Sequence, residues 1–155
     1  MGDAYKSTRL TPDAHLGEIG GIPLVLEAVE CNATAVVVHL GCRHNDVTRA
    51  LDAEYETAIA SWAPEALAAK EQGVRSPDPP AQPGAFLNDI PLMLSDDLGT
   101  TYFALKKQAA GSGTEWKGKW TFEPGVPATP AVLTIAVDDD GCRGQAHAMR
   151  HPSMK

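Results

Sequence analysis

The chain has 155 residues, enough for one domain with a hydrophobic core, and 43% of them are apolar, which argues against wholesale disorder. The formal net charge of −7 argues against a general nucleic-acid-binding protein and against docking on anionic lipid, because both need an excess of Lys and Arg. The N-terminus lacks the apolar run of a secretory signal, and no segment is apolar for long enough to span a membrane. We therefore expect a cytoplasmic protein that binds neither nucleic acid nor membrane.

The cysteines are consistent with that location. Cys31, Cys42 and Cys142 are odd in number and lack the C-x-x-C spacing of metal and redox motifs. In a cytoplasmic chain we expect three free thiols. A Cys31–Cys42 disulfide is the alternative for an extracellular protein, because these two residues flank one expected pair of strands.

The first clear pattern along the chain is a β-hairpin over residues 22–42. Apolar side chains alternate in two runs, 22–29 and 35–42, and alternation places every second side chain on one face of a strand. A short turn, "CNAT", joins the two runs. The side chains expected to share the core face are Ile22, Leu24, Leu26, Ala28, Val36, Val38, Leu40 and Cys42.

A helical pattern follows the hairpin. Apolar residues recur at intervals of three and four from Val47 to Trp62, and either Asn45 or Asp46 can cap the start of the helix. Because this stripe includes large aromatic side chains, we expect the helix to cover the sandwich. The alternative is that it binds a partner protein.

The helix is expected to kink or break near Pro64, because proline lacks the amide proton of an intrahelical hydrogen bond. The following segment, 74–85, is rich in proline and cannot form a central strand or a helix. We expect it to return the chain to the sheet as an extended loop. Residues 45–85 thus form a helical and Pro-rich insertion between strands.

Residues 86–137 show strand patterns throughout. The clearest strand is "WKGKWTFEP", in which apolar residues and glycine alternate with lysines and other polar residues. The side chains expected to face the core from it are Trp116, Gly118, Trp120 and Phe122. Other expected strands include Leu92 and Leu94, residues 100–107 and residues 131–137, with a Gly-rich loop at 111–115. Short strands separated by turn signals favour a mainly β, antiparallel sandwich.

The C-terminal half also resembles a known group of domains. Its "LSDDLGTTYF" hairpin, its strand ending in "F-x-P" and its "L-x-I" strand carry the residues Asp97, Gly99, Tyr102, Phe122, Pro124, Leu133 and Ile135. This pattern is similar to that of uncharacterised bacterial immunoglobulin-like β-sandwich domains, many of them actinobacterial, and residues 16–41 look like the first hairpin of the same domains. The resemblance implies an immunoglobulin-like antiparallel sandwich of about six to eight strands, and it implies no catalytic residues.

We expect a single domain over residues 1–140, followed by a mobile tail over 141–155 that has little apolar content and no periodicity. The 45–85 insertion lies within the domain, between two strands of the sandwich.

Two acidic clusters are candidate sites for Ca²⁺ or Mg²⁺, which prefer carboxylate and carbonyl oxygens. Asp96 and Asp97 lie in the turn of "SDDLG", and Asp138, Asp139 and Asp140 follow the last expected strand. Loops at one end of a sandwich converge, so the two clusters can meet there. The competing interpretation is that Asp96 and Asp97 simply form a turn, because Asp side chains accept hydrogen bonds from their own backbone.

A second candidate metal site contains softer ligands. Thiolate, thioether and imidazole groups suit Cu(I) or Zn²⁺, although their spacing here matches no structural zinc pattern. The residues concerned are Cys42, His44, Cys142, His147, Met149, His151 and Met154. A solvated tail is the competing interpretation.

No catalytic constellation is recognisable: the chain has no G-x-S-x-G motif and no phosphate-binding Gly-rich motif. Trp116 and Trp120 can stack on a ligand, but their position on the apolar face of a strand is more typical of a core. We therefore expect a non-enzymatic binding module without a cofactor, and a protein partner that binds through 45–85. The alternative is a metal-binding protein that uses the acidic loops or the tail.

Overall fold

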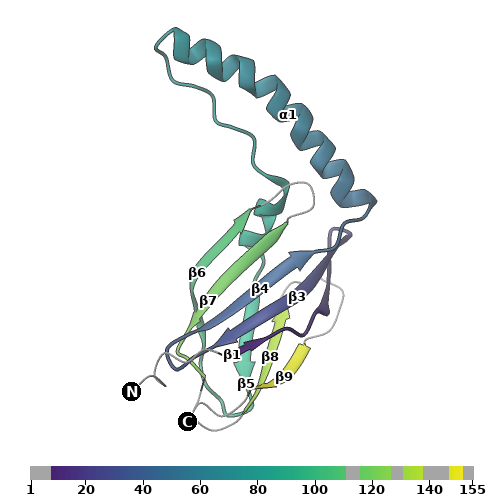
Figure 1. Cartoon of the computed structure of the whole chain (residues 1–155), viewed down its shortest axis with the longest axis vertical. Coiled ribbons are helices and arrows are strands. Elements are labelled where there is room, and N and C mark those ends of the chain that lie inside the picture. Colours follow the sequence, from purple (N-terminus) through teal and green to yellow (C-terminus); the bar gives the residue numbers. More distant parts are fainter. Residues whose placement is uncertain (1–7, 111–115, 127–130, 138–146, 152–155) are drawn as a thin grey trace.

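The structure is a computed structural model that describes residues 8–110, 116–126, 131–137 and 147–151. These residues form two antiparallel sheets, one long helix and one short 3₁₀-helix (Figure 1). In chain order, the elements are β1 (Thr8–Leu10), β2 (Ala14–Ile19), β3 (Ile22–Cys31), β4 (Val36–Cys42), α1 (Asp46–Glu71), the 3₁₀-helix η2 (Pro83–Asp89), β5 (Leu92–Asp96), β6 (Phe103–Ala110), β7 (Lys117–Glu123), β8 (Ala131–Val137) and β9 (His147–His151).

The larger sheet has six strands in the order β1–β3–β4–β7–β6, with β2 also paired to β3. β1 pairs with one end of β3 and β2 with the other, so these two short strands follow one another along the same edge. The smaller sheet has the order β5–β8–β9. The prediction of a mainly β, antiparallel fold with an inserted helical segment is confirmed, whereas the sequence patterns above do not predict β1 and β2.

The core lies between the two sheets. Leu26 and Leu40 of the larger sheet belong to one buried cluster together with Leu94 and Ile135 of the smaller sheet. Because each sheet covers the apolar face of the other, the two form a sandwich whose core closes without the long helix.

The β3–β4 hairpin is confirmed, with one correction to the faces of β3. The register shifts between Leu26 and Ala28, which marks a β-bulge at that point. Beyond the bulge Ala28 pairs with His39, while Val29 pairs with the buried Val38. The inward face of β3 therefore passes from Leu26 to Val29, because a bulge inserts one residue and reverses the alternation.

The expected alternation in β7 is confirmed. Trp120 and Phe122 are buried, whereas Lys117 and Lys119 are exposed. The two tryptophans of this region, Trp116 and Trp120, are each 1% exposed, so they are core residues and do not form an open aromatic face.

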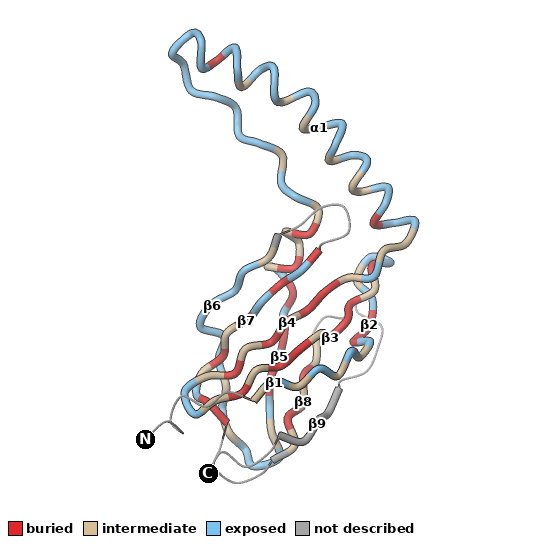
Figure 2. Tube along the Cα trace, in the orientation of Figure 1, coloured by how far each residue is buried: buried red, intermediate tan, exposed pale blue. Residues whose placement is uncertain are grey.

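The long helix α1 does not cover the sandwich, contrary to expectation. It points away from one end of the two sheets and leaves most of its surface exposed (Figures 1 and 2). It also continues without a break through Pro64. Pro64 and Ala60 are both exposed, so the carbonyl that proline leaves unpaired is open to water. No helix in the part of the chain that the structure describes is long and apolar enough to cross a membrane.

Part of the C-terminal segment is paired with the smaller sheet. Within 141–155, where we expect a mobile tail, residues His147–His151 form β9 on the edge of β8. These five residues are therefore strand rather than free tail, because their main chain completes the ladder along β8. The Gly-rich loop expected at 111–115 lies outside the described residues.

Candidate functional site: a projecting helical arm

The candidate site is α1 with the segment 72–82 that returns from it, which together we call the arm. The arm contacts the sandwich first at the N-terminus of the helix. The side chain of Asn45 accepts a hydrogen bond from Thr48 N at 3.0 Å, and Thr48 Oγ1 accepts one from Asn45 N at 2.8 Å. This reciprocal capping box satisfies two amides that a helix start otherwise leaves unpaired. Asn45 Nδ2 also donates to Gly21 O at 2.8 Å, which ties the helix start to the β2–β3 turn.

A second contact between the helix and the sandwich lies farther along α1. The indole of Trp116, which is 1% exposed, donates from Nε1 to Asp52 Oδ1 at 3.0 Å. The rings of His44 and Phe86 meet Trp116 edge-on, each with a centroid distance of 6.0 Å. A charge-assisted hydrogen bond at the end of a buried core aromatic gives the arm a defined starting direction.

The far end of the arm is held by the returning segment. Trp62 Nε1 donates to Pro77 O at 2.8 Å, and Val74 N donates to Ala69 O at 3.0 Å. Ala69 is 7% exposed beneath this segment. Trp62, at the end of the apolar stripe, therefore contacts the chain's own Pro-rich connector and not the sandwich, contrary to expectation.

The rest of the arm is open to solvent. In α1 only Thr48 and Ala69 are buried, and Figure 2 shows exposed residues along most of the helix and the returning segment. Leu67 and Val74 are 58% and 55% exposed. An exposed helix with this much apolar surface is typical of a protein-interaction element.

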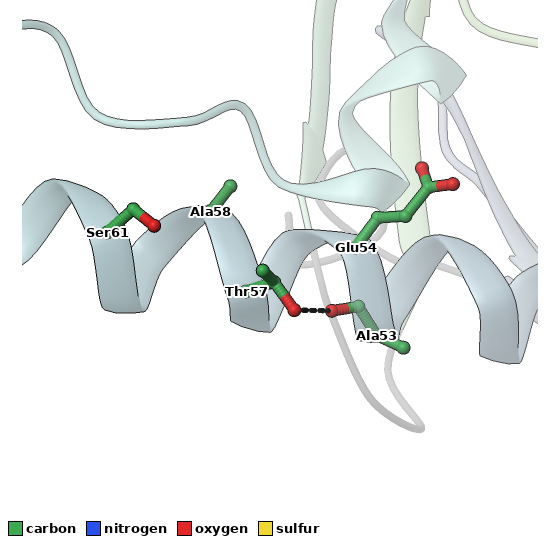
Figure 3. Close-up of a pocket in the computed structure, with 5 residues that line it drawn as sticks. All are labelled: Ala53, Glu54, Thr57, Ala58 and Ser61. Atoms are coloured by element: carbon green, nitrogen blue, oxygen red, sulfur yellow. Dashed lines mark hydrogen bonds between the residues drawn. The ribbon is translucent and has the colours of Figure 1, made fainter.

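One side of α1 carries a shallow depression of about 420 Å³. It is lined by Ala53, Glu54, Thr57, Ala58 and Ser61, and Figure 3 shows these side chains along consecutive turns of the helix. Thr57 Oγ1 donates to Ala53 O at 3.0 Å, so the hydroxyl of this lining residue is already hydrogen-bonded within the helix. Small side chains let another chain approach the helix closely, and Glu54 adds one negative charge to the lining.

The structure places Asp96 in a turn where hydrogen bonds occupy its carboxylate. Oδ1 accepts from the main-chain N–H groups of Leu98 and Thr100, both at 3.0 Å, and Oδ2 accepts from the Tyr102 hydroxyl at 2.8 Å. Partial burial works to raise the pKa of Asp96, but the hydrogen bonds from Thr100, Tyr102 and Leu98 outweigh it and lower the pKa. Burial, and then the charge and hydrogen bond of Asp96, raise the pKa of Tyr102.

The second carboxylate of the turn has a different task. Asp97 Oδ1 accepts from Val132 N at 2.9 Å, and Asp97 N donates to Val132 O at 3.2 Å. These contacts join the turn after β5 to the start of β8. The turn interpretation therefore accounts for Asp96, whereas Asp97 joins two segments of the smaller sheet. The expectation that "LSDDLGTTYF" forms a hairpin is wrong, because β5 pairs with β8 and β6 pairs with β7 in the other sheet. Asp138, Asp139 and Asp140 lie outside the described residues.

The thiol, thioether and imidazole side chains of the second candidate metal site lie on different elements or outside the described residues. His44 Nδ1 lies 3.1 Å from Thr48 Oγ1 at the base of the arm, and Cys42 lies at the end of β4. His147, Met149 and His151 belong to β9, while Cys142 and Met154 lie outside the described residues. Among the residues that the structure describes, no group of three or more His, Cys, Asp or Glu side chains is arranged to hold a metal ion.

The two described cysteines are free. Cys31 pairs with Val36 at one end of the β3–β4 ladder, and Cys42 pairs with Leu24 at the other, so the alternative Cys31–Cys42 disulfide is wrong. Burial raises the pKa of the Cys31 thiol to about 11, and burial together with the charge of Glu27 raises that of Cys42 to about 12. Neither thiol has the lowered pKa of a nucleophile.

Sequence reasoning missed a charged surface on the outside of the larger sheet. Glu30 binds both Arg9, at 2.7 Å, and His39, at 3.1 Å. The hydrogen bond with His39 and then that with Arg9 lower the pKa of Glu30, although its partial burial opposes them. Beside this group lies a polar pocket of about 190 Å³, whose lining includes Glu27 and Lys117. The available signal was that Glu27, His39 and Lys117 take outward positions in the expected strands, whereas Arg9 lies on β1, which the sequence patterns do not predict.

Comparison of the chain with protein-family models, with curated proteins and with solved structures finds no match. The resemblance to bacterial immunoglobulin-like domains therefore stays a prediction.

Proposed function

We propose that this protein is a non-enzymatic binding module: a β-sandwich that presents the arm to a protein partner. The observation that supports it most is that the surface of α1 is exposed while its N-terminal part is hydrogen-bonded to the sandwich. The helix buries only two of its 26 residues, yet its start is capped, tied to Gly21 and hydrogen-bonded to a core tryptophan. A helix this exposed is marginal in isolation, so these contacts stabilise it in one direction while leaving its surface available.

We further propose that the sandwich is immunoglobulin-like. The larger sheet contains the order β3–β4–β7–β6 and the smaller sheet the order β5–β8–β9. With strands lettered A to G from β3 onward, these are the A–B–E–D and C–F–G sheets of a constant-type immunoglobulin domain. On this assignment, the arm is inserted between strands B and C, and β1 and β2 extend the A edge. The free thiols of Cys31 and Cys42 support the proposal of a cytoplasmic location, where thiols stay reduced.

The test compares two single substitutions on α1. Thr57→Arg places a long side chain in the lining of the depression, and Ala63→Arg places the same side chain at an exposed position outside it. Both positions are exposed, so neither substitution is expected to affect folding by more than about 0.5 kcal/mol. Circular dichroism confirms that the helix is retained in each variant.

Affinity capture from a lysate of the source organism, followed by mass spectrometry, then measures binding. We expect wild-type and Ala63→Arg to retain the same partner and Thr57→Arg to lose it. If every captured protein is retained by Thr57→Arg, the depression on α1 is not the binding surface.

A further inference from the structure

The outer face of β6 and β7 is basic although the chain as a whole is acidic. Four of the seven lysines of the chain lie on these two strands, three of them on the outer face, against one acidic residue, Glu123. An uneven distribution of this kind creates a local positive potential that net charge does not reveal.

The strand register shows which side chains share this outer face. Lys119 pairs with His39 on one side and with Gln108 on the other, and Thr121 pairs with Lys106. Directly opposed residues of an antiparallel pair point to the same face. Since Trp120 is buried on the inner face, its neighbours Lys119 and Thr121 point outward. We call the surface of Lys106, Gln108, Lys117, Lys119 and Thr121 the basic face.

The positive charge of the basic face is only partly balanced. Lys117 lies 3.8 Å from Glu27, whereas neither Lys106 nor Lys119 forms an ion pair with a carboxylate of the described residues. β6 is exposed from Phe103 to Gln108, and its apolar residues Phe103 and Leu105 are 58% and 62% exposed (Figure 2). The strand thus combines unpaired cations with exposed apolar surface.

The surface complementary to the basic face exists in the same chain. α1 has six acidic and two basic residues. Glu54 and Glu65 are eleven residues apart, about three helical turns, so they lie on one side of the helix. Glu54 also lines the shallow depression of small side chains, which lets a partner approach the helix closely.

We propose that two copies of this chain form a closed dimer in which α1 of each copy docks on the basic face of the other. The proposal rests on the proposed function, because it uses the arm as the binding surface and identifies its partner as a second copy. Acidic helix and basic sheet face attract one another, and the exposed Phe103 and Leu105 add apolar contact at the rim.

Docking on the face is favoured over strand addition at the edge of β6. Lys107 pairs with the buried Trp120, so it points toward the inner side of this edge strand. The register also shifts between Ala104 and Lys106, which marks a bulge at Leu105. Inward charges and bulges on an edge strand both oppose pairing with a further strand.

The contact area favours a reciprocal dimer over a single contact. Seven or eight strand residues span about 25 Å, and a helix covers a strip about 10 to 12 Å wide, so each side contributes about 300 Å². One contact therefore buries about 600 Å² in total, which is too small for a specific interface. Two symmetric contacts bury about 1,200 Å², the lower end of the specific range, and predict an affinity of roughly 1–100 µM that weakens with salt.

The test is the mass of the purified full chain, measured by sedimentation velocity and light scattering from about 1 to 300 µM. We expect twice the monomer mass of 16.4 kDa at high concentration, with dissociation favoured when salt is raised from about 50 to 500 mM. Lys106→Glu/Lys119→Glu and Glu54→Lys/Glu65→Lys should each weaken the dimer about 30-fold or more, from four surface ion pairs lost per dimer. Arg43→Glu, which reverses an exposed charge outside both surfaces, is the control for a change in net charge alone.

A charge exchange keeps the test independent of folding defects. Each double variant repels itself, because its helix and its basic-face positions then carry the same sign. An equimolar mixture of the two has both contacts complementary and should form a heterodimer of wild-type affinity. The chain with all four substitutions should dimerise again. A wild-type chain that is monomeric throughout, a larger open assembly, or a dimer that survives both double variants would each overturn the proposal.

These results are separable from the fate of the proposed function. A monomeric wild-type chain that still captures another protein through Thr57 removes only the second copy as partner. A chain that neither dimerises nor captures a Thr57-dependent partner removes both proposals.

Discussion

Replacing Asp96 with Ala tests whether this carboxylate is a structural part of the turn between β5 and β6. The substitution removes three hydrogen bonds: one from the Tyr102 hydroxyl at 2.8 Å and two from the main-chain N–H groups of Leu98 and Thr100 at 3.0 Å. The bond from the half-buried Tyr102 to a charged acceptor is worth about 2 kcal/mol. The hydrogen bond from each amide contributes about 0.5 kcal/mol to the free energy of unfolding. This is the low end of the usual range for a hydrogen bond, because water can replace the lost partner.

The total predicts that Asp96→Ala lowers the free energy of unfolding by about 3 kcal/mol, or Tm by about 9 °C for a domain of this size. Asp97→Ala is the matched control: it changes the neighbouring carboxylate, which accepts one hydrogen bond from Val132 N. It should cost only about 1 kcal/mol. Urea unfolding followed by tryptophan fluorescence at pH 7 measures both values.

The pH dependence gives a second readout with a definite sign. The folded pKa of Asp96 is lowered below its ordinary value, so its stabilising contribution is present above the unfolded pKa of about 3.9 and is lost as pH falls through the folded pKa. The difference between wild-type and Asp96→Ala should therefore shrink as the pH falls from 5 toward 3. A loss no larger than that of Asp97→Ala, or a difference that is constant over this range, would refute the structural role of the carboxylate.

Three further predictions concern the arm base, the thiols and one tight turn. Trp116→Phe removes the indole donor to Asp52 but keeps most of the ring, so it should cost about 1–3 kcal/mol and speed amide exchange in α1 relative to β3, which hydrogen-exchange mass spectrometry measures. The pKa values of the Cys31 and Cys42 thiols are raised to about 11 and 12, so at pH 8 a thiol reagent should label the buried Cys31 only as fast as the chain unfolds and the half-buried Cys42 more slowly than an exposed thiol; rapid labelling of Cys31 in folded protein, located by peptide mapping, would contradict its burial. Gly125→Ala would bring its Cβ into the main-chain atoms of Asn32 and Ala33 in the β3–β4 turn, so we expect a loss of about 2–4 kcal/mol in urea unfolding; an unchanged midpoint would be the contrary result.

The sheets were predictable from sequence because a strand's alternation is local. The pairs Leu26–Leu40 and Trp120–Val38 both follow from period-two patterns that are visible in the sequence. The bulge after Leu26 was not predictable, because it depends on how β3 pairs with β4 and leaves a nearly continuous apolar run. β6 begins at Phe103, later than the expected residue 100, because Thr100 and Tyr102 are engaged by Asp96 in the preceding turn.

The helix was predictable, whereas its placement was not. An apolar stripe shows that a helix meets apolar surface, but it does not show which surface. Here the position of α1 depends on the hydrogen bond between Asp52 and Trp116, which are 64 residues apart, and on the contact of Trp62 with Pro77. Both are tertiary contacts without a local sequence signature. The sequence therefore favoured a helix packed on the sandwich, which is more common than a helix that projects from it.

The same distinction applies to charge. A net charge of −7 describes the composition of the whole chain and does not show where its charges lie. Antiparallel pairing of β6 and β7 nevertheless places Lys106 and Lys119 on one face, while the helix collects acidic residues on a separate projecting element. A partner meets a surface of one sign and not the average of the chain, since potentials fall off within about 10 Å at ordinary salt. The arm and the basic face are therefore suited to partners of opposite charge, and in the proposed dimer a second copy of the chain supplies both.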